Sequence, residues 1–363
     1  MPTYQTMPQF EHGLPESTGI LVVNLGTPEA PTSGAVRRFL RQFLSDPRVI
    51  EYPRLLWWLI LNFIILVIRP PRSAAAYRKI WTDRGSPLML HSRAIASELH
   101  GRLDAAAEGA FHVELAMTYG EPTISNAVDK LLAKGARRIV TLPLYPQYSG
   151  TTTAPVFELV AGKMGHLRWI PETRFITSYH DAPGYIDALA SSVRESWVAN
   201  GKGEKLLMSF HGVPESTLLN GDPYHCQCQK TARLLAAELE LGDDDWLITF
   251  QSRVGREKWL APYTDQTIKK LGKQGLSRID VVCPGFASDC LETLEEIAIQ
   301  NAEFFEAAGG GSLQYIPCLN ARDDHVLFLT ELVQRHTAGW ANNNDASSFH
   351  QSRERAQAMG AVS

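Results

Sequence analysis

The stretch VVCPGFASDCLETLEE, residues 281–296, decides the fold class of this chain. Its two valines close an apolar run typical of a buried strand, and the Pro-Gly pair that follows breaks that run. Asp289 then stands where a helix cap belongs, and Glu292 and Glu296 lie four residues apart, on one face of the predicted helix. A buried strand that leads directly into a helix predicts a parallel sheet covered by helices.

The same alternation of short apolar runs and helical patterns continues along the chain. Strands are predicted at 20–25, 112–119, 138–144, 206–211, 246–251, 279–283 and 313–317. Helices are predicted at 125–134, 183–199, 231–241, 265–273, 291–308 and 323–335. Two similar blocks of strand and helix predict two doubly wound domains that join near 169–185, with the last helix returning to the first domain.

Composition narrows the class of protein. The 363 residues are 44% hydrophobic and 20% charged, which gives two domains material for a core. A formal charge of −4 and scattered Lys and Arg argue against a nucleic-acid partner, because counterion release needs clustered cations. Five cysteines, an odd number, and a start without a basic and then apolar segment favour a reducing compartment and no export signal. The polar, aperiodic ends predict disordered tails at 1–18 and 340–363.

One apolar run, LLWWLILNFIILVI at 55–68, has basic residues on both sides. As a helix it would reach about 21 Å, against roughly 30 Å for a hydrocarbon core, so it is too short to span a membrane. Two interpretations stay open. It is a buried core helix, or an exposed lip that grips an apolar ligand or enters a membrane surface with Trp57 and Trp58 at the interface. The basic flanks favour the lip.

His211 ends the predicted strand 206–211, and the carboxyl ends of parallel strands meet at the edge where such sheets bind ligands. A histidine near its ordinary pKa can accept a proton or hold a divalent metal at neutral pH. Glu292 and Glu296 add hard oxygen ligands, and their mutual repulsion is expected to raise one pKa if both face one cavity. The combination predicts a site that handles metal and protons, and the alternative is a solvated acidic helix face.

Several separated motifs are similar to those of the ferrochelatase family, most closely its proteobacterial form, from about 19 to 333. They are Leu25-Gly26-Thr27-Pro28, Tyr77 with Gly85-Ser86-Pro87, Tyr145-Pro146-Gln147-Tyr148-Ser149, Ser209-Phe210-His211-Gly212, Gln251-Ser252-Arg253 with Trp259-Leu260, and Gly285-Phe286-Ala287-Ser288-Asp289 running into Leu291-Glu292-Thr293-Leu294. Each motif alone is a weak signal, and the set is highly specific.

The resemblance implies an α/β fold of two Rossmann-like, chelatase-type domains, each with a parallel four-stranded sheet flanked by helices. We expect an N-terminal domain at 19–174 plus 314–339, with the lip at 55–68, and a C-terminal domain at 175–313. The implied activity is insertion of ferrous iron into protoporphyrin IX with release of two protons. The implied location is the cytoplasm, with peripheral contact to the inner membrane through the lip.

The resemblance also implies roles for individual residues. His211 and Glu292 would be the paired metal and proton residues, and Asp289 and Glu296 would extend an acidic path. Porphyrin-binding residues would be Leu25, Arg69, Tyr77, Tyr119 and Trp259, with Arg69 at a propionate. Iron is then a substrate, and no tightly bound cofactor is expected.

Cysteine chemistry adds two expectations. Cys226 and Cys228 form a C-x-C pair that lacks a second pair at ligand spacing, and the C-terminal cysteine cluster of animal members is absent, so no iron–sulfur cluster is expected. Cys290 stands where many family members carry histidine, and a thiol is a softer ligand and a poorer base at neutral pH. That departure leaves the role of position 290 open.

Two other functions compete with this reading. A two-lobed metal or tetrapyrrole carrier would bind its ligand in the same cleft without turnover, and a cobalt or nickel chelatase would use the same fold. The Trp- and Leu-rich lip and the porphyrin-pocket motifs favour the iron enzyme. The sequence shows no cluster of cations for the two additional propionates of coproporphyrin.

Overall fold

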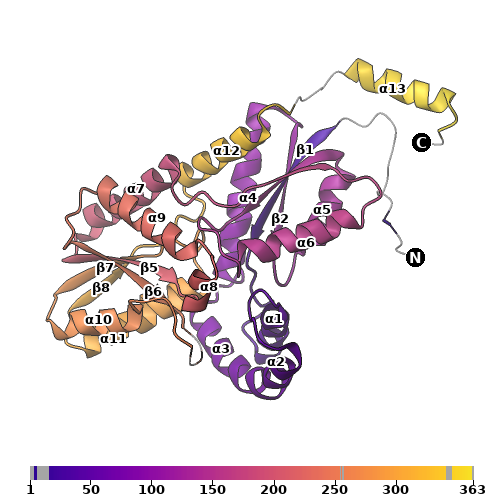
Figure 1. Cartoon of the computed structure of the whole chain (residues 1–363). Coiled ribbons are helices and arrows are strands. Elements are labelled where there is room, and N and C mark those ends of the chain that lie inside the picture. Colours follow the sequence, from indigo (N-terminus) through magenta and orange to yellow (C-terminus); the bar gives the residue numbers. More distant parts are fainter. Residues whose placement is uncertain (1–3, 6–15, 254, 256, 341–345, 362–363) are drawn as a thin grey trace.

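The computed structural model describes residues 4–5, 16–253, 255, 257–340 and 346–361, and it contains two parallel sheets (Figure 1). The first sheet has the order β2-β1-β3-β4, from β1 (Ser17–Asn24), β2 (Phe111–Met117), β3 (Ala136–Pro143) and β4 (Glu172–Phe175). The second has the order β6-β5-β7-β8, from β5 (Lys205–His211), β6 (Trp246–Gln251), β7 (Arg278–Val282) and β8 (Ser312–Tyr315). The predicted fold class is confirmed.

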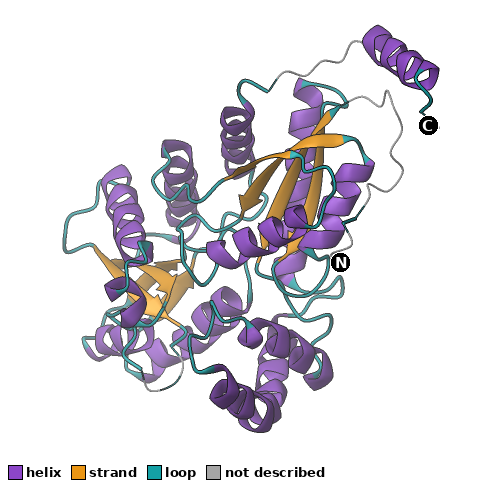
Figure 2. Ribbon diagram, turned by 45° about the vertical axis from the view of Figure 1, so that its right-hand side comes forward, coloured by secondary structure: helices purple, strands orange, loops and turns teal. Residues whose placement is uncertain are grey.

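Helices cover both sheets, and a separate group of helices lies beside them (Figures 1 and 2). The first half of the chain contributes α1 (Ser33–Ser45), α2 (Arg54–Ile60), η1 (Leu61–Ile65), α3 (Leu66–Ile80), α4 (Pro87–Ala106), α5 (Ile124–Ala133) and α6 (Thr153–Gly165). The second half contributes α7 (Pro183–Asn200), α8 (Glu215–Leu219), α9 (Tyr224–Glu238), α10 (Thr264–Lys273), η2 (Glu292–Asn301), α11 (Ala302–Ala307), α12 (Asp323–Thr337) and α13 (Ala346–Ala358).

All seven predicted strands are present within a few residues, and one strand was missed. Central strand β1 is buried along its whole length, as its apolar sequence predicts. The missed strand, β4, has the sequence ETRF and lies at the edge of the first sheet. A polar edge strand of four residues carries no apolar alternation, which is why its sequence gives no signal.

Gly26 fixes the turn that follows β1. Its φ is +112°, and a Cβ added there would lie 1.8 Å from the carbonyl oxygen of Tyr119. Only glycine can therefore bring this turn so close to the segment after β2. The turn places Leu25 and Tyr119 together in one apolar cluster with residues of α3 and η2.

The predicted division into domains stays a prediction, although both of its boundaries fall inside strands. The boundary at 174/175 falls within β4, which pairs with β3 up to Thr141↔Phe175. A boundary at 313/314 would cut β8, which pairs with β7 from Arg278↔Ser312 to Val281↔Tyr315. Helix α12 packs on α4 and also on α7, so it contacts helices of both halves of the chain.

Both predicted tails need correction. Ser17 and Thr18 belong to β1, and the described residue Gln5 hydrogen-bonds with His166 and Arg168 through its backbone. Residues 6–15 and 341–345 lie outside the described residues. At the other end, α13 is helical within the range predicted to be disordered, because AQA and its neighbouring Arg, Glu and Gln residues are good helix formers.

The apolar run at 55–68 lies in a helical segment longer than predicted. Helices α2, η1 and α3 follow one another from Arg54 to Ile80, and this 27-residue segment is the one candidate, in the described part of the chain, that is long and apolar enough to cross a membrane. Length and composition alone are weak support for a span, and the α3 end packs against the protein through buried Ala74 and Tyr77.

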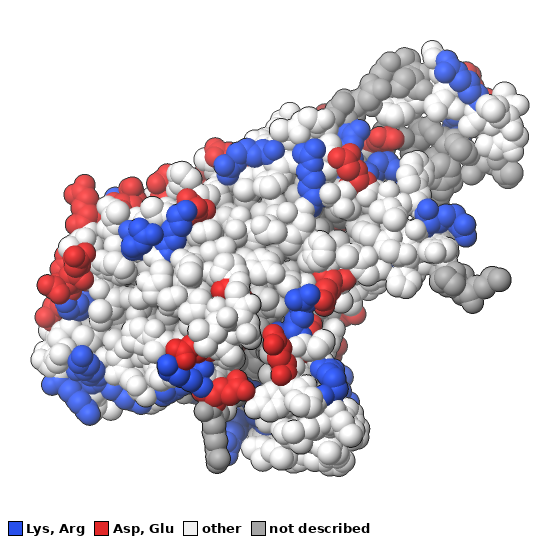
Figure 3. Space-filling view, viewed as in Figure 1, with Lys and Arg blue, Asp and Glu red and all other residues white. Residues whose placement is uncertain are grey.

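The exposed part of this segment is defined as the lip: Leu55, Leu56, Trp58, Leu59, Phe63, Ile64, Val67 and Ile68. Leu55 is 77% exposed and Phe63 is 67% exposed, which excludes a buried core helix for this face. In Figure 3 the surface over α2 is free of charged side chains, and charged side chains lie above it, toward α1. Eight exposed large apolar side chains on one helical segment indicate an interaction site rather than ordinary surface.

Candidate functional site

The helix that carries the predicted acids is a π-helix, η2, over its first ten residues, where the sequence predicts an α-helix. Two side-chain amides hold carbonyls of this helix. Gln251 Nε2 donates to the carbonyl of Glu292 at 2.7 Å, and Asn301 Nδ2 donates to the carbonyl of Glu296 at 2.8 Å. The wider turn keeps Glu292 and Glu296 on one face, and π-helical turns recur at functional sites.

His211 ends β5 directly beside this helix. It pairs with Gln251 in the sheet register, and its ring lies 6.4 Å from that of Phe286. Its Nδ1 lies 2.6 Å from the carbonyl oxygen of Gly212. Because a carbonyl only accepts, Nδ1 carries the proton in the neutral ring and Nε2 is the free acceptor.

Glu296 is held by Ser252, the residue after β6. The Ser252 N–H donates to Oε1 at 2.8 Å, and its hydroxyl makes a short hydrogen bond to Oε2. Ser252 adopts φ +64°, a left-handed conformation that costs energy for a residue other than glycine. Burial raises the pKa of the Glu296 carboxyl; the Ser252 hydrogen bond and the His211 imidazole oppose this, and Glu292 adds to it. The pKa is thus raised as expected, but chiefly by burial.

Glu292 faces two residues of α3, Arg69 and Tyr77, which come from the first half of the chain. Burial lowers the pKa of the Arg69 guanidinium, and the charge of Glu292 opposes this. Burial raises the pKa of Tyr77, and both Glu292 and Cys290 raise it further. Lys79, also on α3, forms a 2.7 Å ion pair with Glu295. Helix α3 and η2 therefore oppose one another across the site, with Glu292 between them.

Cys290 is buried beside Glu292, and burial followed by the charge of Glu292 raises the pKa of its thiol. The thiol therefore stays protonated near neutral pH and is a weak base and metal ligand. All five cysteines, Cys226, Cys228, Cys283, Cys290 and Cys318, are free thiols, and only Cys226 is exposed.

The structure does not bring Asp289 to the open side of the site. Its Oδ1 accepts hydrogen bonds from the hydroxyls of Thr293 and Tyr315 and from the N–H of Cys318, and its Oδ2 accepts one from Asn320 Nδ2 at 2.7 Å. Asp289 also does not cap the helix, whose first cap position is Leu291. The carboxylate instead ties the start of η2 to the loop after β8.

The five predicted porphyrin-binding residues divide into two groups. Leu25, Arg69 and Tyr77 lie near η2, and half-buried Trp259 packs over Gly212, where an added Cβ would lie 3.2 Å from its ring. The indole Nε1 of Trp259 is buried without a partner among the described residues. Tyr119 is different, because its hydroxyl donates to Asp46 at 2.8 Å and it is 3% exposed.

Three residues that hold this site were not predicted individually: Gln251, Ser252 and Lys79. Gln251 ends a strand at the ligand edge and Ser252 follows it, and this position was the available signal. Lys79 has no such signal, because its partner lies 216 positions further along the chain.

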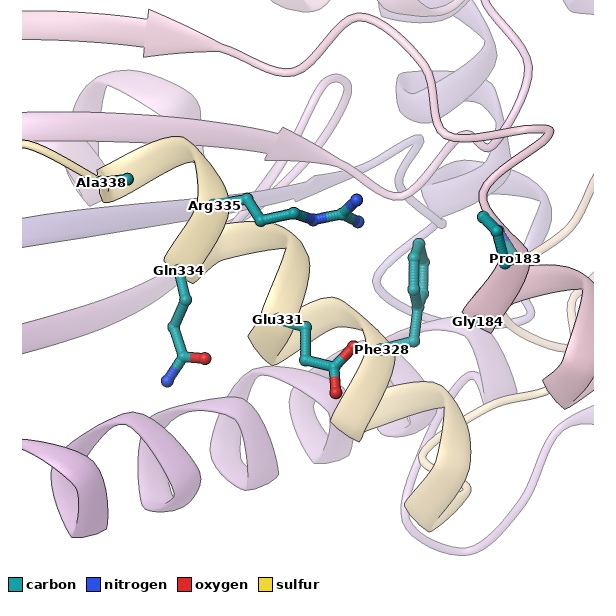
Figure 4. A pocket seen from close by; sticks show the side chains of 7 residues that line it. All are labelled: Pro183, Gly184, Phe328, Glu331, Gln334, Arg335 and Ala338. Carbon is teal, nitrogen blue, oxygen red and sulfur yellow. The ribbon is translucent and has the colours of Figure 1, made fainter.

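Among the described residues, no group of three or more His, Cys, Asp and Glu side chains is arranged to hold a metal ion. Figure 4 shows a pocket elsewhere, where α7 begins beside α12. It is lined by Pro183, Gly184, Phe328, Glu331, Gln334, Arg335 and Ala338, and so by none of the predicted site residues.

Comparison with known proteins gives one consistent result. The sequence model of the family described as Ferrochelatase matches residues 17–337. A ferrochelatase of Thioalkalivibrio sulfidiphilus is 54% identical over 359 residues, which cover 97% of each chain. A ferrochelatase of Idiomarina loihiensis is 52% identical over 338 residues, which cover 93% of each chain.

Solved structures add support for the fold alone. SirB from Bacillus subtilis with Fe3+ matches with a TM-score of 0.52 at 12% identity, over 89% of this chain and 96% of that one. The sirohydrochlorin chelatase SirB from B. subtilis subspecies spizizenii, in complex with cobalt, matches with a TM-score of 0.50 at 9% identity, over 89% of this chain and 97% of that one. The two-sheet architecture is therefore shared with chelatases.

Proposed function

The chain belongs to the ferrochelatase family, and from this premise we propose that His211 and Glu292 are the residues that receive the pyrrole protons and the iron. The enzyme inserts ferrous iron into protoporphyrin IX and forms protohaem with release of two protons, the last step of haem biosynthesis. The observation that carries the assignment is the position of η2, which brings Glu292 and Glu296 beside the end of β5 at His211.

His211 has the right free atom for a proton acceptor. With Nδ1 bound to the Gly212 carbonyl, Nε2 keeps its lone pair and can take a proton from a pyrrole nitrogen. A planar macrocycle must pucker before its N–H groups become accessible. Apolar and aromatic walls that hold the puckered shape stabilise a geometry close to the transition state. Leu25, Tyr77 and Trp259 are the proposed walls.

Glu292 and Glu296 are proposed to handle the iron and the released protons in turn. Ferrous iron loses water as it approaches the porphyrin, and a carboxylate that exchanges for water lowers the cost of that loss. We assign this exchange of iron-bound water for a carboxylate oxygen to Glu292. Glu296, whose pKa is raised chiefly by burial, is the carboxyl that we propose takes up and releases the proton. Arg69 would then serve a propionate while limiting the negative charge around Glu292.

We propose that no tightly bound cofactor takes part. Four of the five thiols are buried, and burial raises the pKa of Cys228, Cys283, Cys290 and Cys318, so each resists loss of the proton that metal binding requires. We therefore expect the purified enzyme to lack an iron–sulfur cluster.

The residue assignment is tested by an anaerobic assay with ferrous iron and protoporphyrin IX, in which loss of free-porphyrin fluorescence reports metallation. We expect His211→Ala to abolish turnover and Glu292→Gln to slow it severely, with porphyrin binding retained in both. Normal turnover by either variant would remove that residue from the proposed pair. Tight porphyrin binding without metallation by the wild type would support a carrier instead.

We also propose that the enzyme is cytoplasmic and that the lip enters a membrane surface. Trp58 and Phe63 lie in T-shaped contact at 5.9 Å, and both are more than half exposed. Aromatic side chains of this kind favour the membrane interface, and Arg54 and Arg72 flank the lip as partners for anionic headgroups.

Sedimentation with vesicles of equal phosphatidylglycerol and phosphatidylcholine tests this proposal. Leu55→Glu and Phe63→Glu should release the protein into the supernatant. Val198→Glu is a matched control, because Val198 is a 90% exposed apolar residue on α7, a helix that lies away from α2 and α3 in Figure 1. Wild-type protein that stays in the supernatant, or a control that behaves like the lip variants, would contradict a membrane role for the lip.

A further inference from the structure

Gln251, the last residue of β6, contacts Glu292 and also Gly212, the residue that follows His211. It is 3% exposed, and its side chain and its backbone point to different targets. The side-chain Nε2 donates to the carbonyl oxygen of Glu292 at 2.7 Å. The backbone carbonyl accepts from the N–H of Gly212 at 2.8 Å.

The orientation of the Gln251 amide is fixed by its neighbours. Its Oε1 accepts from the hydroxyl of Ser209 at 2.7 Å and from the thiol of Cys283 at 3.7 Å. Ser209 is completely buried and lies 2.9 Å from the hydroxyl of Thr264. With two donors at the oxygen and a carbonyl at the nitrogen, only one orientation of the amide satisfies every partner.

The contact with Glu292 sets the start of η2. Helix η2 begins at Glu292, and a side-chain donor on the carbonyl of that residue holds the peptide at the point where the wide helical turn opens. The position of the Glu292 side chain follows from the position of this peptide. A buried donor at 2.7 Å fixes it more firmly than exchanging water would.

The second contact sets His211. The Gln251 carbonyl holds the Gly212 peptide, and the carbonyl of Gly212 accepts from His211 Nδ1. An added Cβ on Gly212 would lie 2.8 Å from the Gln251 carbonyl oxygen, so this close approach depends on glycine. Gln251 therefore holds the backbone of Glu292 and also the peptide of Gly212, whose carbonyl selects the tautomer of His211.

We propose that Gln251 is a positioning residue for iron insertion, which sets the separation of His211 and Glu292 without touching substrate. The inference rests on the proposed function of that pair. Residues that orient metal-handling groups typically contribute 10- to 100-fold to affinity or activity. Loss of the side-chain amide is expected to act on the Glu292 contact, because the backbone contact with Gly212 does not depend on the side chain.

Gln251→Glu is the main test, since it keeps the shape and the acceptor for Ser209 but places an oxygen against the Glu292 carbonyl. Gln251→Met is the second variant, because it keeps the volume and removes the amide without introducing a charge. Gln147→Met is the matched control. Gln147 is a buried amide, 2% exposed, that donates to Thr231 at 3.0 Å and to the carbonyl of Pro284 at 3.3 Å rather than to η2.

All variants are assayed anaerobically with ferrous iron and protoporphyrin IX at a temperature where circular dichroism shows full folding. We expect kcat to fall about 10- to 100-fold in both Gln251 variants, while the KM for protoporphyrin stays within about twofold of wild type. The control should keep its kcat. Equal kcat in the Gln251 variants and the control would overturn the proposal and leave Gln251 a purely structural residue.

A double-mutant cycle separates this inference from the proposed function. If Gln251 acts through Glu292, adding Gln251→Met to Glu292→Gln should cost little further activity, whereas independent effects would multiply. Multiplying effects would overturn the positioning role even if Glu292→Gln is slow. A Glu292→Gln single variant with normal turnover would instead remove the proposed pair itself.

Discussion

Replacing Ser252 by glycine should move the pH dependence of catalysis, because the Ser252 hydrogen bond lowers the pKa of Glu296 against the raising effect of burial. The substitution removes the hydroxyl that donates to Oε2 and leaves the N–H that donates to Oε1. Glycine is the choice here because residue 252 has φ +64°, which glycine adopts without strain. The backbone around Glu296 should therefore survive the change.

The expected magnitude follows from the contact that is lost. A hydrogen bond to a charged group contributes about 1.5–3 kcal/mol. Since 1.36 kcal/mol corresponds to one pH unit, the Glu296 carboxyl should ionise about 1–2 pH units higher in the variant than in the wild type. The sign is upward, because the lost hydrogen bond favours the charged form while burial, which favours the neutral form, remains.

The assay is the anaerobic pH profile of kcat/KM for ferrous iron insertion into protoporphyrin IX. The acidic limb of the profile should move to higher pH in Ser252→Gly, with the plateau rate largely retained. Ser252→Ala serves as a comparison, since it loses the same hydroxyl but keeps the left-handed strain that glycine relieves. The alanine variant should therefore be less thermally stable than the glycine variant. An acidic limb that stays in place, or moves to lower pH, would refute the role of Ser252 in holding a catalytic Glu296 carboxylate.

Three further predictions concern buried polar residues outside the proposed catalytic pair. Asp289→Asn should lower the free energy of unfolding by about 1–3 kcal/mol in urea titrations, because it leaves buried donors without their charged acceptor, and unchanged stability would argue against the hydrogen-bond network. His325 is buried and neutral, with its pKa lowered from 6.5 to about 4 mainly by burial, so the unfolded chain binds more protons between these values and stability should rise with pH from 4 to 6.5, by about 3 kcal/mol in all. His325→Asn should flatten this slope, and a slope equal to that of the wild type would contradict the assignment. Tyr119→Phe should cost about 1 kcal/mol of stability through its lost hydrogen bond to Asp46 and leave the porphyrin dissociation constant, measured by fluorescence, unchanged; weaker porphyrin binding would show that the Tyr119 hydroxyl takes part in binding.

Patterns within single segments predicted most of this structure. The buried strands around β1 and β5 are continuous apolar runs, and the helices between them have ordinary periodicity, so the two-sheet class followed from the sequence. The ends of β5 and β7 then placed His211 and the acidic helix at one edge, because parallel strands share a direction.

Features that depend on distant partners were not predictable in the same way. The π-helical form of η2 involves Gln251, from another strand, and no periodicity in ETLEEIAIQN distinguishes it from an α-helix. The sequence suggested that Asp289 is available, yet its carboxylate is bound by Tyr315, at the end of β8, and by Asn320, in the loop after it. Burial of a polar side chain by remote donors leaves no mark on its own neighbours in sequence.

Chemical rescue of His211→Ala tests the central claim most directly, namely that the His211 imidazole accepts the pyrrole protons. Single-turnover iron insertion is followed anaerobically by protohaem absorbance at increasing concentrations of added imidazole. We predict that the variant is inactive alone, that imidazole restores a saturable rate, and that the restored rate follows the fraction of imidazole in its neutral form. A variant that metallates porphyrin at the wild-type rate without imidazole would contradict the claim.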